Sequence, residues 1–76
     1  MILETTIDIF NTELDNMGIE LLMPVRFTVD TQEICAIREH VEKSETEPSL
    51  TKCVIYLRSG ESFIIHSNYS YVFGLI

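Results

Sequence analysis

Positive charge and cysteine are both scarce in this sequence, and each shortage excludes a class of proteins. Among 76 residues there are 5 Lys and Arg against 12 Asp and Glu, which gives a net charge of −7. Because nucleic-acid-binding proteins neutralise phosphates with clustered Lys and Arg, we expect no direct binding to DNA or RNA. The two cysteines, Cys35 and Cys53, are too few for the disulfide framework of a small secreted domain, and the sequence shows no secretory leader. We therefore expect a cytoplasmic protein with free thiols.

Long apolar runs are missing as well. No run approaches the 18 or so apolar residues of a membrane-spanning helix, so we expect no membrane partner. The 46% hydrophobic content is sufficient for a folded core, and the length indicates a single domain over residues 1–76. A domain of this size buries little surface and is only marginally stable alone, which favours a homo-oligomer.

The cysteines and histidines do not have the spacing of a metal site. Cys35-x4-His40 and Cys53-x12-His66 lack the paired short spacings of structural zinc sites. Cys35 and His40 are the one nearby pair of nucleophile and base, but residues five apart diverge even on a helix. We expect His66 to be a solvated residue at the end of a strand. The sequence therefore predicts no enzyme, no catalytic residue, no cofactor and no metal.

The N-terminal residues show a helical repeat of apolar side chains. The repeat has alternating spacings of four and three and consists of Leu3, Ile7, Phe10, Leu14 and Met17. This is the stripe of an amphipathic helix, and Gly18 is a typical residue to end one. The stretch TTIDIF alone could also be extended, because threonine and isoleucine are stiff at χ1. We interpret residues 1–22 as a helical segment whose stripe binds a partner.

The middle of the chain contains one clear strand and one ambiguous segment. In residues 25–29 apolar and polar side chains alternate, as in a half-buried strand, and DTQ at 30–32 follows as a turn. In residues 33–42, Ile34, Ile37 and Val41 have helical spacing, but an alternating strand pattern is present too. Local propensity favours the helix.

Residues 52–66 predict a β-hairpin around Ser59 and Gly60, after a polar loop at 44–51. A three-residue turn with the glycine in the left-handed region would pair Leu57 with Glu61 and Ile55 with Phe63. We prefer this register because it separates apolar from polar side chains on the two faces of the hairpin. The inner face then carries Cys53, Ile55, Leu57, Phe63 and Ile65, and the outer face carries Lys52, Val54, Tyr56, Arg58, Ser62, Ile64 and His66.

Two surface features exceed what a plain core requires. Val54, Tyr56 and Ile64 make the outer face of the hairpin more apolar than a solvated face needs to be, so we expect a partner or another element to cover it. The acidic residues are concentrated before residue 51, where they would steer the molecule towards a basic partner. The acidic residues to which we assign this role are Glu39, Glu42, Glu45 and Glu47.

Residues 67–76 predict a short C-terminal helix. Ser67 or Asn68 would be its N-cap, and the apolar residues at helical spacing are Tyr69, Val72, Phe73 and Ile76. A final strand is the alternative, because apolar residues also alternate from Tyr69 to Leu75.

From residue 25 onward, an opening strand, a polar turn, an I-x-x-I segment and a glycine-centred hairpin follow one another. This pattern resembles small β-rich bacterial and phage regulatory modules of the flagellar FlbD type. The matching residues are Ile34, Ile37, Val54, Tyr56 or Leu57, Gly60, Phe63, Ile65, Val72 and Ile76. The resemblance implies that residues 33–42 form a strand, which we adopt over local propensity. It also implies a non-catalytic adaptor or regulator.

Together these features predict an α+β fold: an N-terminal amphipathic helix (1–22), and a β-rich core (23–76) with a four-stranded antiparallel β-meander and a short C-terminal helix. We expect a small non-catalytic protein-binding adaptor or regulatory module that self-associates through the N-terminal stripe or the Val54, Tyr56 and Ile64 face. The alternative is an acidic inhibitor of the kind phages encode, which occupies the nucleic-acid-binding channel of a basic enzyme.

Overall fold

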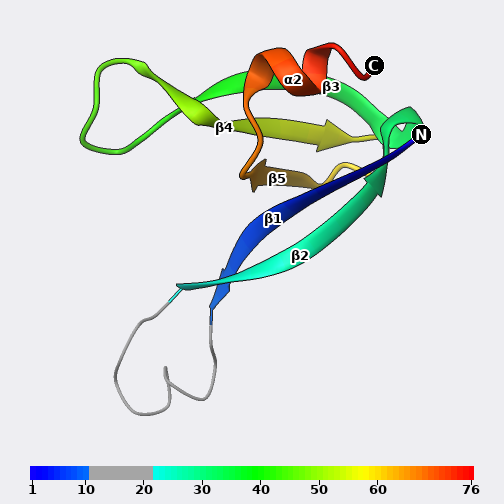
Figure 1. Cartoon of the computed structure of the whole chain (residues 1–76), viewed down its shortest axis with the longest axis horizontal. Helices are drawn as coiled ribbons and strands as arrows, with labels where there is room; N and C mark the ends of the chain where they lie inside the picture. The colour runs from blue at the N-terminus through cyan, green and yellow to red at the C-terminus, as the bar shows by residue number, and fades with distance from the viewer. Residues whose placement is uncertain (11–21) are drawn as a thin grey trace.

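The structure, a computed structural model, describes residues 1–10 and 22–76, and within these residues the chain is mostly β (Figure 1). Two antiparallel sheets contain the described strands. The elements are β1 (Ile2–Phe10), β2 (Leu22–Asp30), a 3₁₀ turn η1 (Thr31–Glu33), β3 (Ile34–Val41), β4 (Pro48–Leu57), β5 (Ser62–Ile65) and the short helix α2 (Tyr69–Phe73). The predicted α+β fold is therefore wrong.

The predicted N-terminal helix is a strand. β1 pairs with β2 along its whole length, from Ile2 opposite Asp30 to Phe10 opposite Leu22. Five of its nine residues are isoleucine or threonine, which pack well on a pleated sheet and lose χ1 freedom in a helix. Leu14 and Met17 lie outside the described residues.

The second sheet has the order β3-β4-β5. The strand at residues 33–42 is confirmed by β3, which pairs with β4. The four-stranded meander is wrong, because β2 pairs with β1 instead of β3. The polar loop is shorter than predicted, since β4 already begins at Pro48.

The predicted hairpin register is confirmed. Ile55 lies opposite Phe63, and the backbone N–H of Leu57 donates to the carbonyl of Glu61 at 2.8 Å. Gly60 has φ +95°, in the left-handed region that residues with a Cβ rarely adopt. The short C-terminal helix is confirmed by α2, and its N-cap is Asn68, whose Oδ1 accepts from the N–H of Tyr71 at 2.7 Å.

The core joins both sheets and the helix. Its fully buried side chains are Leu3, Cys53, Ile55, Ile65 and Val72. Phe27 of β2 contacts Phe63 of β5, with ring centroids 4.7 Å apart. The side chains that the hairpin register assigned to the interior pack in the core. On the opposite face of the β3-β4-β5 sheet Val54 is also buried, at 3% exposed, whereas Ile64 is 47% exposed.

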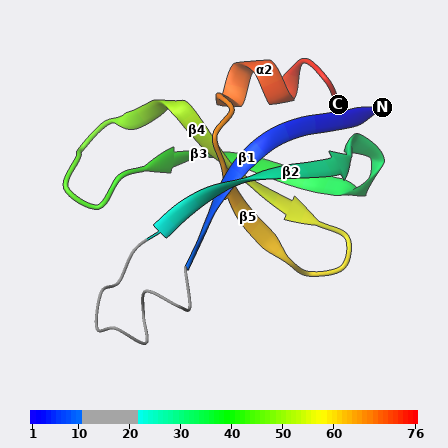
Figure 2. The same ribbon diagram turned by 60° about the horizontal axis from the view of Figure 1, so that its bottom comes forward.

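Hydrogen bonds connect β1 to the end of β5, and others connect the turn η1 to the end of β4. The backbone N–H of His66 donates to the carbonyl of Thr6 at 2.9 Å, beside a 2.7 Å contact between the hydroxyls of Thr5 and Ser67. At the other place, the backbone and Nε of Arg58 donate to the carbonyls of Glu33 and Gln32, each at 2.9 Å. We call the first place the His66 seam. Figure 2 shows the β1-β2 hairpin crossing the second sheet.

Candidate functional site

A groove of about 550 Å³ lies between β1 and the outward face of the second sheet. It lies next to the His66 seam, which holds β1 against the end of β5. Its apolar lining comes from both sheets and consists of Ile7, Leu22, Val54, Tyr56, Phe63 and Ile64. The side chains that were predicted to make the outer face too apolar for water, Val54, Tyr56 and Ile64, thus line one concave surface. We call this surface, with the polar residues described below, the groove face.

The predicted N-terminal stripe does not form one surface. Leu3 is 1% exposed and belongs to the core, whereas Ile7 is half-buried and lines the groove. Phe10 is 61% exposed at the end of β1. In a strand, residues an even number apart share a face, so Leu3 and Ile7 point the same way and Phe10 points the other way.

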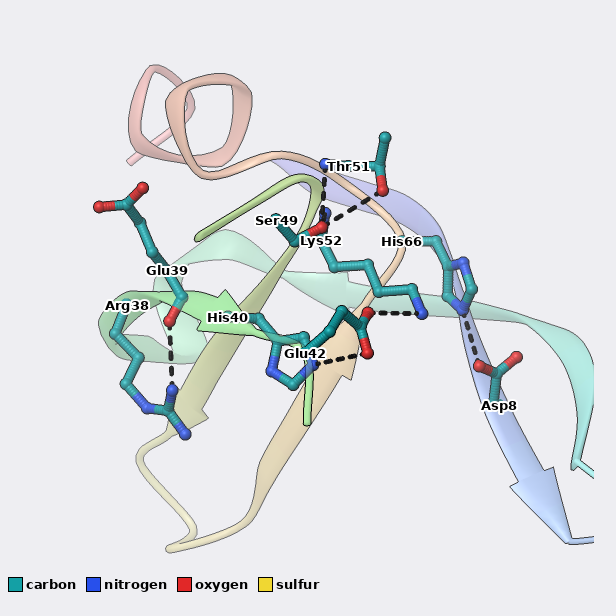
Figure 3. A network of polar contacts seen from close by, with 9 residues as sticks. All are labelled: Asp8, Arg38, Glu39, His40, Glu42, Ser49, Thr51, Lys52 and His66. Atoms are coloured by element: carbon teal, nitrogen blue, oxygen red, sulfur yellow. Dashed lines mark hydrogen bonds and ion pairs between the residues drawn. The ribbon is translucent and has the colours of Figure 1, made fainter. Parts of the chain in front are cut away.

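Two groups of polar side chains lie next to each other along the groove face. Nε2 of His66 lies 3.0 Å from Oδ2 of Asp8, Nζ of Lys52 lies 3.2 Å from Oε1 of Glu42, and Nε2 of His40 lies 3.6 Å from Oε2 of Glu42 (Figure 3). Cys53 pairs with Ile65, so Lys52 and His66, the adjoining residues, stand opposite each other on neighbouring strands. We call the series Asp8, His66, Lys52, Glu42 and His40 the polar row.

The polar row is only partly shielded from solvent. Its side chains range from 16% exposed for His40 to 43% for Glu42. The hydrogen bond from Lys52 lowers the pKa of Glu42; desolvation opposes this shift, and the charges of Lys52 and His40 reinforce it. Glu42 is therefore a carboxylate that lies between the side chains of Lys52 and His40.

A second polar pair fixes the aromatic side of the groove. Nε of Arg38 donates to Oη of Tyr56 at 2.7 Å, and Nη1 of Arg38 donates to the carbonyl of Glu39 at 3.1 Å. Arg38 lies opposite Val54 in the β3-β4 pairing, which places it over the groove lining. These contacts orient the phenol of Tyr56 and restrict its rotation.

His66 is exposed and directly follows β5, as predicted. In addition, both its backbone and its imidazole contact β1, which the sequence did not predict. The sequence did not predict that Asp8, Leu22, Arg38 and His40 would lie on the groove face. For Arg38 and His40 a signal existed, because they alternate along a strand that pairs with Val54 and Tyr56. For Asp8 there was none, because it lies 58 residues from His66.

The cysteines lie in different environments. Cys35 is exposed on β3, whereas Cys53 is fully buried in the core, where desolvation raises the pKa of its thiol. Within residues 1–10 and 22–76, no group of three or more His, Cys, Asp and Glu side chains is placed to hold a metal ion. In that same part of the chain, no helix is long and apolar enough to cross a membrane.

The four acidic residues assigned to steering do not share one environment. Glu39, Glu45 and Glu47 are exposed, whereas Glu42 belongs to the polar row. Glu45 and Glu47 lie in the connection between β3 and β4, close in sequence to Leu50, which is 88% exposed.

Comparison with known proteins identifies no relative: no protein-family model, no curated protein and no solved structure matches this chain. The resemblance of residues 25–76 to FlbD-type modules therefore stays a prediction.

Proposed function

We propose that this chain is a non-catalytic protein-binding module that self-associates through the groove face. The observation that carries this proposal is the group of large apolar side chains left exposed around the groove. Ile64 in the groove is 47% exposed, and Leu22 at its edge is 54% exposed. Ile9, on the same side of the neighbouring strand as Ile7, is 42% exposed. Large exposed apolar side chains at a concavity are typical of protein interaction sites.

The distribution of charge supports a second copy of the chain as the partner. With a net charge of −7, two copies repel each other over most approaches. The groove face is locally balanced, because Arg38 and Lys52 offset Asp8 and Glu42. Two copies that meet through this face bring no excess of like charge together. Association also adds buried apolar surface, which a 76-residue domain otherwise lacks.

Sedimentation velocity over a range of protein concentrations tests the proposal. The variant Ile64→Asp places a charge in the groove and should shift the protein to monomer at concentrations where the unmodified chain is dimeric. Leu50→Asp is the matched control, because it makes the same kind of change at an exposed apolar residue outside the groove lining. It should leave the dimer intact. A chain that is monomeric at all concentrations, or equal effects of the two variants, would refute the proposal.

The acidic inhibitor is the second candidate. The observation in its favour is that Glu45 and Glu47 are exposed, with the protruding Leu50 near them in the sequence, at the turn between β3 and β4. A partner for this turn would be a basic protein, and its binding would weaken steeply with salt. Replacing Glu39, Glu42, Glu45 and Glu47 by glutamine should abolish such binding. Binding to a basic enzyme that does not change with salt would exclude this candidate.

A further inference from the structure

The polar row has an order of charges that complements itself when it is reversed. From β1 to β3 the order is Asp8, His66, Lys52, Glu42 and His40. If a second row faces it in the opposite direction, with the two Lys52 residues at the centre, Asp8 meets His40 of the second copy. His66 then meets Glu42 of the second copy. Each acidic residue therefore faces a histidine, and each histidine faces an acidic residue.

A two-fold axis in the plane of the contact produces this reversed arrangement. Closed symmetric dimers present the same patch from both copies, so a residue and its facing residue exchange roles across the axis. Lys52 lies near the axis, where two like charges meet, and its contact with Glu42 at 3.2 Å partly neutralises each of them. The row keeps exposed polar atoms on the groove face, since its side chains are 16% to 43% exposed.

We propose that the self-association of this chain is a two-fold, pH-sensitive pairing in which the polar rows of two copies face each other in opposite directions. This inference rests on the proposed function and specifies its partner and its regulation. Neutral imidazoles give only neutral-to-ion contacts with Asp8 and Glu42. Protonated imidazoles complete an alternating array of opposite charges across the interface.

The charged groups that face His40 and His66 decide whether association strengthens or weakens as the pH falls. His66 is faced by Asp8 from β1 and by Lys52 from β4, and His40 is faced by Glu42. Arg38, the other cation on this face, is engaged with the hydroxyl of Tyr56. In the dimer each imidazole gains a second carboxylate, so association takes up protons and strengthens as the pH falls through the range in which imidazoles titrate. Protonation of both histidines also reduces the net charge from −7 to −5.

The experiment measures the dimer dissociation constant by sedimentation at pH 8 and at pH 6, with the full chain at constant ionic strength. We expect the dimer to be at least about tenfold tighter at pH 6, because four exposed ion pairs across the interface each contribute a small factor. His40→Gln and His66→Gln should each reduce this ratio, and the double variant should bring it close to one. Far-UV circular dichroism establishes that each variant is folded.

Glu61→Gln is the control for net charge alone. Glu61 is exposed in the turn between β4 and β5 and is not part of the groove lining, and its neutralisation changes the net charge by the same amount as one added proton. It should leave the dissociation constant at pH 8 unchanged within about twofold, which is a small fraction of the free energy of a specific interface. A strengthened dimer in this variant would show that general repulsion, not the polar row, sets the affinity.

The possible results separate the two proposals. A dimer that is equally tight at both pH values, or a pH dependence that survives in the double histidine variant, overturns the polar-row pairing and leaves self-association standing. A chain that stays monomeric at both pH values overturns self-association itself.

Discussion

Leu3→Ala and Phe10→Ala, compared with each other, test whether β1 is a strand with one buried face. Both residues belong to the apolar stripe that spacing assigns to a helix. In the structure Leu3 is 1% exposed and lies in the core, whereas Phe10 is 61% exposed. Truncation of Leu3 therefore leaves a cavity among buried neighbours, and truncation of Phe10 removes mostly solvated surface.

The expected magnitudes differ clearly. Loss of a fully buried leucine side chain costs about 2–5 kcal/mol of unfolding free energy, from lost transfer free energy and the cavity together. Loss of an exposed aromatic on a strand costs at most about 1 kcal/mol, the span of strand propensities. A domain of this length has a total stability of roughly 4–11 kcal/mol at typical values per residue. Leu3→Ala should therefore remove a large part of the stability, although the side chain that it loses is the smaller of the two.

Urea unfolding followed by far-UV circular dichroism provides the measurement. The midpoint should fall strongly for Leu3→Ala and little for Phe10→Ala, at similar m values. The comparison is made below the concentrations at which the chain associates, so that a contact of Phe10 in a dimer does not contribute to the measured free energy of unfolding. Equal destabilisation by the two substitutions would refute the assignment, because it is the result expected if both residues packed on one face of a helix.

Two further predictions concern the cysteines and Glu42. In native buffer a thiol reagent should modify Cys35 alone. Cys53 should react only after unfolding, because it is buried and its pKa is raised. Rapid modification of both thiols in native buffer would contradict the packing of β4. In an NMR titration, the pKa of Glu42 should lie below the ordinary glutamate value and should rise in Lys52→Met, which removes the hydrogen bond that lowers it. Because the folded-state pKa is the lower one, the contact stabilises the fold at neutral pH and its contribution is lost as the pH falls through that folded-state pKa. An unchanged titration in Lys52→Met would contradict the contact.

Sequence reasoning succeeded where the deciding interactions are local. The hairpin of β4 and β5 follows from one glycine and from the separation of apolar and polar side chains on its two faces, and the pairing of Ile55 with Phe63 is confirmed. Three apolar members of the groove face, Val54, Tyr56 and Ile64, follow from the same alternation. The strand at residues 34–41 required the resemblance, because its apolar residues fit both periods equally well.

The N-terminal error and the missed contact of Asp8 with His66 have one physical cause. Leu3 and Ile7 are four apart, and this spacing places two side chains on one face of a helix and equally on one face of a strand. What decides between them is the pairing of β1 with β2, a contact between segments that are distant in sequence. A helix at this position would have removed both the wall of the groove and the carboxylate of Asp8 that meets His66. The groove face could therefore not be found before β1 was known to be a strand, and any test that breaks the pairing of β1 should remove the His66 seam and the groove together.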